Sequence, residues 1–211
     1  MPRKLDPRDT FDTLEEEVMF TIAMLQADED AADLVPEAEG WMGGIDATRG
    51  SDRLFRQEAV SIDAGRISAN QRLDIAVVGF ADALLIDCGK DRQSTRWRSF
   101  FPQVPSLFIK QPLAEETAAV RSWLEASADP ILNQHRDAME KRADNASIAL
   151  SATRNLSIKR ATNLQQREGL AQQLTAARDA LHGTLVKRAQ ERKLPRDWPV
   201  AFFRVEVTKA S

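Results

Sequence analysis

Histidine, cysteine and clustered carboxylates are the side chains that most often support acid–base or metal chemistry, and they are sparse in this chain. It has two histidines, His135 and His182, and one cysteine, Cys88. A di-metal site in a helical bundle would need paired Glu-x-x-His motifs, and only Asp179-x-x-His182 approaches that spacing. We therefore expect no metal or other cofactor and assign no catalytic residue.

The most apolar run, IAVVGFADALLI at residues 75–86, begins like the first strand of a nucleotide-binding domain. A phosphate loop would need a glycine five positions after Gly79, where the chain has Leu84. Twelve helical residues span about 18 Å, which is too short for a hydrocarbon core of roughly 30 Å. The apolar spacing of three and four instead predicts a helix over 68–88, buried in the middle of a bundle and closed by Gly89.

Charge is distributed unevenly along the chain. Residues 9–48 contain twelve acidic side chains and no lysine or arginine, whereas residues 131–197 contain thirteen basic and seven acidic ones. Such asymmetry has two interpretations: the acidic segment packs near the basic one, within the chain or in a dimer, or the basic segment binds nucleic acid or another acidic partner. We favour the first, simpler interpretation.

The basic segment nevertheless supplies the best functional candidate. Phosphate recognition needs positive charge clustered on one face, and four bases lie within fourteen residues that include no acid: Arg154, Lys159, Arg160 and Arg167. On a helix, Arg160 and Arg167 share a face with residues 156 and 163, and Lys159 lies at its edge. These four residues are the candidate surface for nucleic acid or an acidic partner, although the net charge of −3 and the lack of a DNA-binding motif argue against nucleic acid.

Near the N-terminus, apolar residues recur at spacings of three and four and predict a helix over residues 10–28. Thr13-x-x-Glu16 has the form of a capping box at its start. After Pro36, the glycines at 40, 43 and 44 predict an irregular stretch, and Ser51 is expected to cap a short helix. Farther on, Pro112 is expected to start a helix that carries Leu113, Val120 and Leu124 on one face.

Residues 131–194 contain no proline and only two glycines, and Asp129-Pro130 is a good start signal for a helix. Unbroken, this helix would approach about 90 Å, so we expect it either to fold back around 143–147 or near Gly169, or to project and pair in a coiled coil. The candidate self-association face is the leucine stripe Leu170, Leu174, Leu181 and Leu185.

Two aromatic clusters complete the set of candidates: Trp97, Phe100 and Phe101, and Trp198, Phe202 and Phe203. They would either form one cap on the core or line a groove for a partner or ligand. Beyond them, apolar residues alternate over 203–207, which predicts either a short strand or an extended tail.

Taken together, these patterns predict a mainly α protein. It would be a helical bundle with a buried central helix, a long C-terminal helical arm or hairpin, and one short strand at most, divided into residues 1–128 and 129–211 or packed as one domain. The single cysteine rules out an internal disulfide and favours a cytoplasmic protein. We expect a non-enzymatic interaction or assembly protein that acts through helix surfaces, with itself or another protein as partner. The alternatives are a nucleic-acid-binding protein and, less favoured, a small-ligand binder or enzyme with a pocket near the aromatic clusters.

Overall fold

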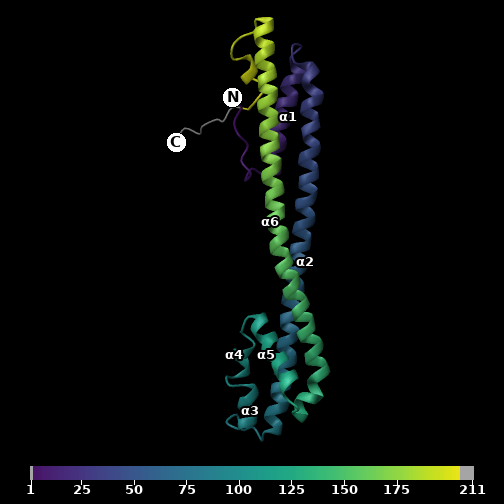
Figure 1. Cartoon of the computed structure of the whole chain (residues 1–211), viewed down its shortest axis with the longest axis vertical. Coiled ribbons are helices and arrows are strands. Elements are labelled where there is room, and N and C mark those ends of the chain that lie inside the picture. Colours follow the sequence, from purple (N-terminus) through teal and green to yellow (C-terminus); the bar gives the residue numbers. More distant parts are fainter. Residues whose placement is uncertain (1, 205–211) are drawn as a thin grey trace. The chain divides into compact units, whose positions relative to one another are not determined.

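The computed structural model describes residues 2–204, which are mainly helical and contain no strand (Figure 1). The predicted all-α fold is therefore confirmed, whereas most of the predicted strand at 203–207 lies outside the described residues. No helix among residues 2–204 is both long and apolar enough to cross a bilayer. The helices are α1 (Phe11–Ala27), α2 (Val35–Asp87), α3 (Thr95–Phe100), α4 (Pro105–Phe108), α5 (Leu113–Ala126) and α6 (Pro130–Arg192), with short 3-10 turns η1 (Ala32–Leu34) and η2 (Trp198–Val200).

The chain forms two compact units. We call Met1–Arg56 with Arg160–Ser211 the terminal unit, and Gln57–Lys159 the central unit. This division differs from the linear boundary expected at residue 128, because α2 and α6 each contribute residues to both units.

Helix α1 matches the helix predicted over residues 10–28, but its cap is not the predicted one. Thr10 is the N-cap, and its hydroxyl accepts a hydrogen bond from the backbone N–H of Thr13 at 3.1 Å. Thr13 therefore lies inside the first turn and cannot begin a capping box with Glu16. A cap must precede the first helical residue, and Phe11 is already helical.

Helix α2 is one unbroken helix of 53 residues, so the predicted irregular stretch at its glycines and the separate helix after Ser51 are both wrong. Each helical glycine costs only about 1 kcal/mol relative to alanine, which tertiary packing can offset. Ala38 and Ile45 supply such packing because both are fully buried in the terminal unit. Ser51 does not cap a helix, since its hydroxyl donates to the carbonyl of Ala47 within α2.

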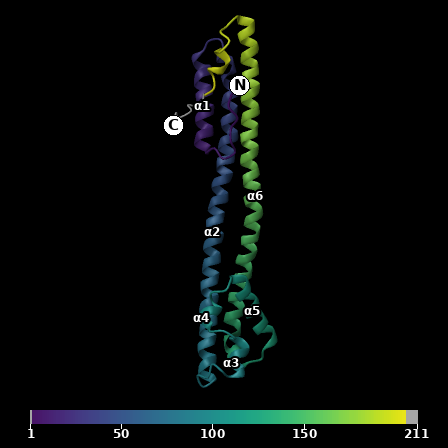
Figure 2. The same cartoon turned by 90° about the vertical axis from the view of Figure 1, so that its left-hand side faces the viewer.

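In the terminal unit, α1 runs alongside the first part of α2 and the last part of α6 (Figures 1 and 2). Two apolar clusters join them. One gathers Leu14, Val18, Ile45, Leu170 and Leu174, and the other gathers Leu25, Ala38, Leu181, Leu185, Phe202 and Phe203. The predicted self-association stripe is thus buried within its own chain, because α1 and α2 cover the face of α6 that carries it.

In the central unit, α3, α4 and α5 pack against the end of α2 and the start of α6 (Figure 1). The predicted helix over residues 68–88 forms the last part of α2, and Gly89 follows it in the left-handed conformation, with φ of 63°. Phe80 is fully buried, whereas Ile75 and Ile86 are each 71% exposed. This helix is therefore buried on one side rather than on nearly all sides, because the neighbouring helices cover only that side.

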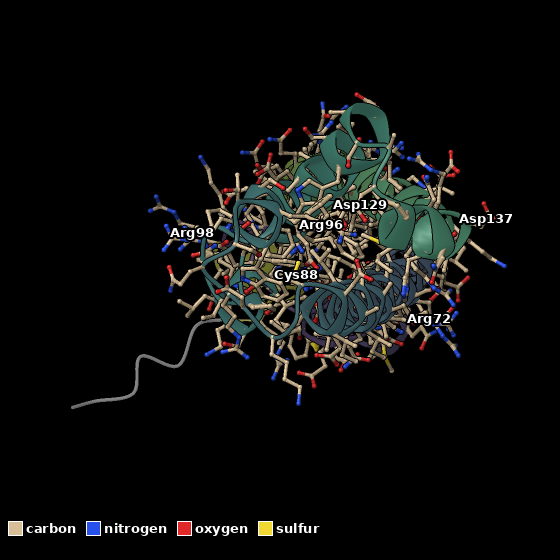
Figure 3. All side chains as sticks on the ribbon, turned by 90° about the horizontal axis from the view of Figure 1, so that it is seen from below. Arg72, Cys88, Arg96, Arg98, Asp129 and Asp137 are labelled. Carbon is tan, nitrogen blue, oxygen red and sulfur yellow. The ribbon has the colours of Figure 1, made fainter. Side chains whose placement is uncertain are left out.

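Helix α6 begins as predicted, because the Asp129 carboxylate accepts hydrogen bonds from the N–H groups of Ile131 and Leu132 at 2.8 and 3.2 Å. Arg96 at the start of α3 donates two hydrogen bonds to the same carboxylate, from Nε at 2.6 Å and from Nη2 at 3.0 Å. Figure 3 shows Arg96 and Asp129 next to one another among packed side chains, whereas Arg98 points outward at the rim. This pair of hydrogen bonds between Arg96 and Asp129 therefore connects the start of α3 to the start of α6.

No fold-back interrupts α6, which continues for 63 residues through 143–147 and Gly169. Ala143 and Ala146 are fully buried in the core of the central unit, and they pack there only as part of a regular helix. In each unit α6 finds apolar partners within its own chain, so it does not need to project and pair with a second molecule.

Candidate anion-binding pocket

The acidic N-terminal segment and the basic end of α6 pair with each other in the terminal unit. Arg178 contacts Glu17 at 2.8 Å, Arg188 contacts Asp33 at 2.5 Å, and Arg192 contacts Asp30. These ion pairs confirm the interpretation that the two oppositely charged segments pack together within one chain. Several of the acidic side chains near the N-terminus thus have their charge balanced by arginines of α6 in the folded chain.

A group of arginines is not fully neutralised in this way. Arg49, Arg53 and Arg56 on α2 and Arg167 on α6 line a cavity of about 410 Å³ beside the first turn of α1. Asp12, Asp52 and the Phe11 ring complete much of its wall. We call this cavity the arginine pocket, and all of its residues belong to the terminal unit.

Three of the four arginines, Arg49, Arg56 and Arg167, make contacts that use only some of the N–H donors of their guanidinium groups. Arg49 donates to Glu15 at 2.5 Å and to Asp12 at 3.2 Å, and the Glu15 hydrogen bond raises the pKa of Arg49. Arg56 contacts the buried carboxylate of Asp52 through Nε at 2.7 Å. Each guanidinium has five N–H donors, so these contacts orient the side chain and leave other donors available.

Arg167, which comes from α6, is positioned by contacts with the start of the chain. Its Nη2 donates to the backbone carbonyl of Asp9 at 3.2 Å. Its guanidinium carbon lies 5.2 Å from the centroid of the Phe11 ring, and that of Arg49 lies 5.9 Å from the same centroid. Cation–π attraction of this kind favours a fixed placement of both arginines around Phe11.

The charges of the pocket do not cancel. Among the residues that line the pocket, four arginines stand against two carboxylates, Asp12 and Asp52. Glu15 and Asp46 act on Arg49 from outside this lining. Arg53 is exposed and has no ion-pair partner among residues 2–204. A concave surface with excess positive charge and spare N–H donors is suited to bind an anion.

The predicted basic surface is only partly reproduced. Arg167 lines the pocket, but Arg154 and Lys159 belong to the central unit, and Lys159 pairs with Glu58 at 2.5 Å. Arg160 is exposed on the terminal unit. The face predicted to carry Arg160 and Arg167 also carries Asn163, which is buried, so that face is not turned wholly to solvent.

Sequence reasoning missed Arg49, Arg53 and Arg56. Their spacing of four and three residues places them on one helical face, and this pattern is visible in the sequence. The signal was lost because the neighbouring glycines predicted an irregular stretch rather than a continuous helix. Only the long α2 brings the three arginines into line with Arg167.

The two aromatic clusters belong to different units. Trp97, Phe100 and Phe101 are buried in the core of the central unit, where Phe101 and Trp123 lie 5.3 Å apart between ring centroids. Phe202 and Phe203 are buried in the terminal unit, with Trp198 packed against them. Each cluster therefore packs into the core of its own unit.

A second charged arrangement lies in the central unit, where Glu116 on α5 is fully buried. Burial, and after it the neighbouring charge of Asp74, raises the pKa of Glu116 to about 8. Burial also raises the pKa of Asp74, which accepts a hydrogen bond from Asn70 at 3.1 Å. Burial and the neighbouring carboxylate therefore favour the protonated form of Glu116 near neutral pH.

Among residues 2–204, no group of three or more histidine, cysteine, aspartate or glutamate side chains is arranged to hold a metal ion. His135 lies beside Phe80, His182 lies beside Phe203, and Cys88 packs against the core of the central unit. Comparison of the chain with protein-family models, curated proteins and solved structures finds no match.

Proposed function

We propose that this chain is a non-enzymatic, intracellular interaction protein that binds an acidic group of a partner in its arginine pocket. The observation that carries the proposal is the convergence of four arginines from α2 and α6 on one cavity with excess positive charge. The pocket's cations are guanidinium groups, which stay charged at physiological pH and do not exchange protons with a substrate. Their chemistry is therefore recognition rather than acid–base catalysis.

Arg53 is the residue that best separates binding from folding. Its side chain is exposed and holds no ion pair among the described residues, so replacing it leaves the contacts of Arg49, Arg56 and Arg167 in place. Arg154 offers a matched control, because it is an exposed arginine on α6 in the central unit.

The test is fluorescence anisotropy with a labelled oligoglutamate peptide and, separately, a labelled single-stranded oligonucleotide. We expect salt-dependent binding of at least one acidic probe, lost in Arg53→Glu and retained in Arg154→Glu. The absence of binding to either probe would contradict the proposal, as would equal loss in the two variants. Oligonucleotide binding lost only in Arg154→Glu would instead favour the nucleic-acid surface along α6.

A further inference from the structure

The arginine pocket offers more donors than a single carboxylate can use. Arg56 engages Asp52 through Nε, which leaves the N–H groups of both terminal nitrogens. Arg167 engages a backbone carbonyl through Nη2 and keeps the donors of Nε and Nη1, while Arg53 keeps its whole guanidinium free of ion pairs within residues 2–204. A carboxylate is planar and is matched by one guanidinium fork, whereas a phosphate group presents three terminal oxygens in different directions.

The direction of approach also differs among these arginines. Arg53 and Arg56 come from α2, and Arg167 comes from α6, so two helices supply the arginines that line the pocket. Donors supplied by two separate helices suit a tetrahedral group better than a planar one. This arrangement favours a phosphate over a carboxylate as the anion.

The first turn of α1 adds a feature of a different kind. Thr10, Phe11 and Asp12 line the pocket, so the N-terminal end of a helix of 17 residues lies at its wall. The first N–H groups of a helix have no intrahelical acceptor, and the helix dipole makes that end attractive to phosphate. The N-cap hydroxyl of Thr10 satisfies the N–H of Thr13, which leaves the N–H groups of Phe11 and Asp12 without intrahelical partners.

Two carboxylates in the wall would repel an anion if they were unpaired. Both are engaged, because Asp12 pairs with Arg49 and the buried Asp52 pairs with Arg56. They therefore act as positioning groups that hold two of the arginines. The cavity of about 410 Å³ is within the range of small-molecule sites and exceeds the size of one phosphate, so it accommodates a diphosphate or a phosphorylated side chain.

From these observations we infer that the arginine pocket is a site for a phosphomonoester or diphosphate group. The inference rests on the proposed function and names the anion that the pocket selects. The group has two sources, a free diphosphate or a phosphorylated residue of a partner protein, and the same chemistry recognises both. A nucleic-acid backbone differs because each phosphodiester carries one charge and has two of its oxygens esterified.

The experiment is isothermal titration calorimetry on the full chain with four probes: inorganic diphosphate, citrate, a phosphoserine peptide with its unphosphorylated parent, and a single-stranded oligonucleotide without a terminal phosphate. We expect diphosphate, the phosphoserine peptide or both to bind more tightly than citrate. A preference for diphosphate alone would identify a free ligand, and a preference for the phosphopeptide would identify a protein partner. Affinity should fall about tenfold or more in Arg53→Gln and stay unchanged in Arg154→Gln.

The failure of this inference is distinguishable from the failure of the proposed function. Citrate or oligoglutamate binding that depends on Arg53, without preference for the phosphorylated probes, would overturn the phosphate assignment and leave acidic recognition standing. Tighter binding of the oligonucleotide than of diphosphate would also overturn it. No binding of any probe would overturn both proposals. Circular dichroism should show equal helicity in all variants, which confirms that they fold. Arg56→Lys is a second variant of the pocket, which keeps the positive charge and removes the guanidinium group.

Discussion

The buried guanidinium of Arg178 and the carboxylate of Glu17 form an ion pair of 2.8 Å in the interior of the terminal unit. The pair connects α6 to α1, and the Arg178 guanidinium also lies 5.5 Å from the centroid of the Phe203 ring. Burial lowers the pKa of Arg178, and the nearby carboxylate of Glu17 opposes that shift. This cation is therefore tolerated in the core because Glu17 accompanies it.

Replacing Glu17 with glutamine should destabilise the terminal unit strongly. The change leaves a buried guanidinium without its counter-ion, which costs about 3–5 kcal/mol of unfolding free energy. Urea unfolding followed by circular dichroism measures the loss. Glu16→Gln is the matched control, because the neighbouring Glu16 is exposed and its surface pair with Arg204 should contribute little to stability. A loss below 1 kcal/mol in Glu17→Gln would show that Glu17 does not compensate the buried charge.

Burial of Glu116 makes the stability of the central unit depend on pH. Its pKa of about 8 in the folded chain exceeds the ordinary 4.5, so the folded state binds more protons than the unfolded state between these values. The stabilising contribution of Glu116 is therefore fully present below the ordinary pKa of 4.5. It falls as the pH rises toward the folded-state pKa of about 8 and is lost above that pH. The slope from this one group is at most about 1.4 kcal/mol per pH unit.

Urea unfolding between pH 5 and pH 9 tests this dependence. Glu116→Gln should flatten the decline, because glutamine does not titrate, whereas Glu115→Gln on the exposed side of α5 should leave it unchanged. An undiminished decline in Glu116→Gln would assign the pH dependence to another group. Asp74 contributes in the same direction, because its pKa is also raised.

Two glycines in the interior of α2, near its N-terminal end, should be replaceable by alanine with a gain in stability. A Cβ atom at Gly43 or Gly50 would meet no heavy atom within 4 Å, so the helix propensity of alanine is gained without a clash. Each substitution should raise the unfolding free energy by about 0.5–1 kcal/mol, measured by urea unfolding. Gly89→Ala should do the opposite, because Gly89 has a positive φ that alanine adopts at a cost of roughly 1–2 kcal/mol. Destabilisation by Gly43→Ala would contradict the continuous helix.

The leucine stripe of α6 should prove essential for folding rather than for self-association. Leu181 is fully buried, so Leu181→Asp places an uncompensated charge in the core and should abolish the cooperative unfolding of the terminal unit. Leu164→Asp is the control, because Leu164 lies on the same helix and is 53% exposed. Circular dichroism and light scattering report folding and mass together. A folded Leu181→Asp variant with reduced mass would instead assign Leu181 to an interface between copies.

Local signals were sufficient for several elements. Apolar spacing predicted α1, Pro112 predicted the start of α5, Asp129 predicted the cap of α6, and Gly89 predicted the end of α2. These features depend on hydrogen bonds and backbone conformations among residues that are close together in the sequence, so local residue types predict them. The opposite charges of residues 9–48 and 131–197 likewise predicted that the two segments pack near each other.

The remaining features depended on which surfaces meet. Glycines and a serine indicated breaks in α2, but burial of Ala38 and Ile45 outweighs their weak local preferences. The leucines of α6 are apolar whether they face another molecule or their own chain, and only the packing of α1 and α2 decided between the two. The arginine pocket arose in the same way, because Arg53 and Arg167 are 114 positions apart in the printed sequence and share a cavity only after α2 and α6 pack. Sequence alone thus determined the helical character and the charge segregation of this protein, whereas tertiary packing decided which charged side chains pair with each other and which line the arginine pocket.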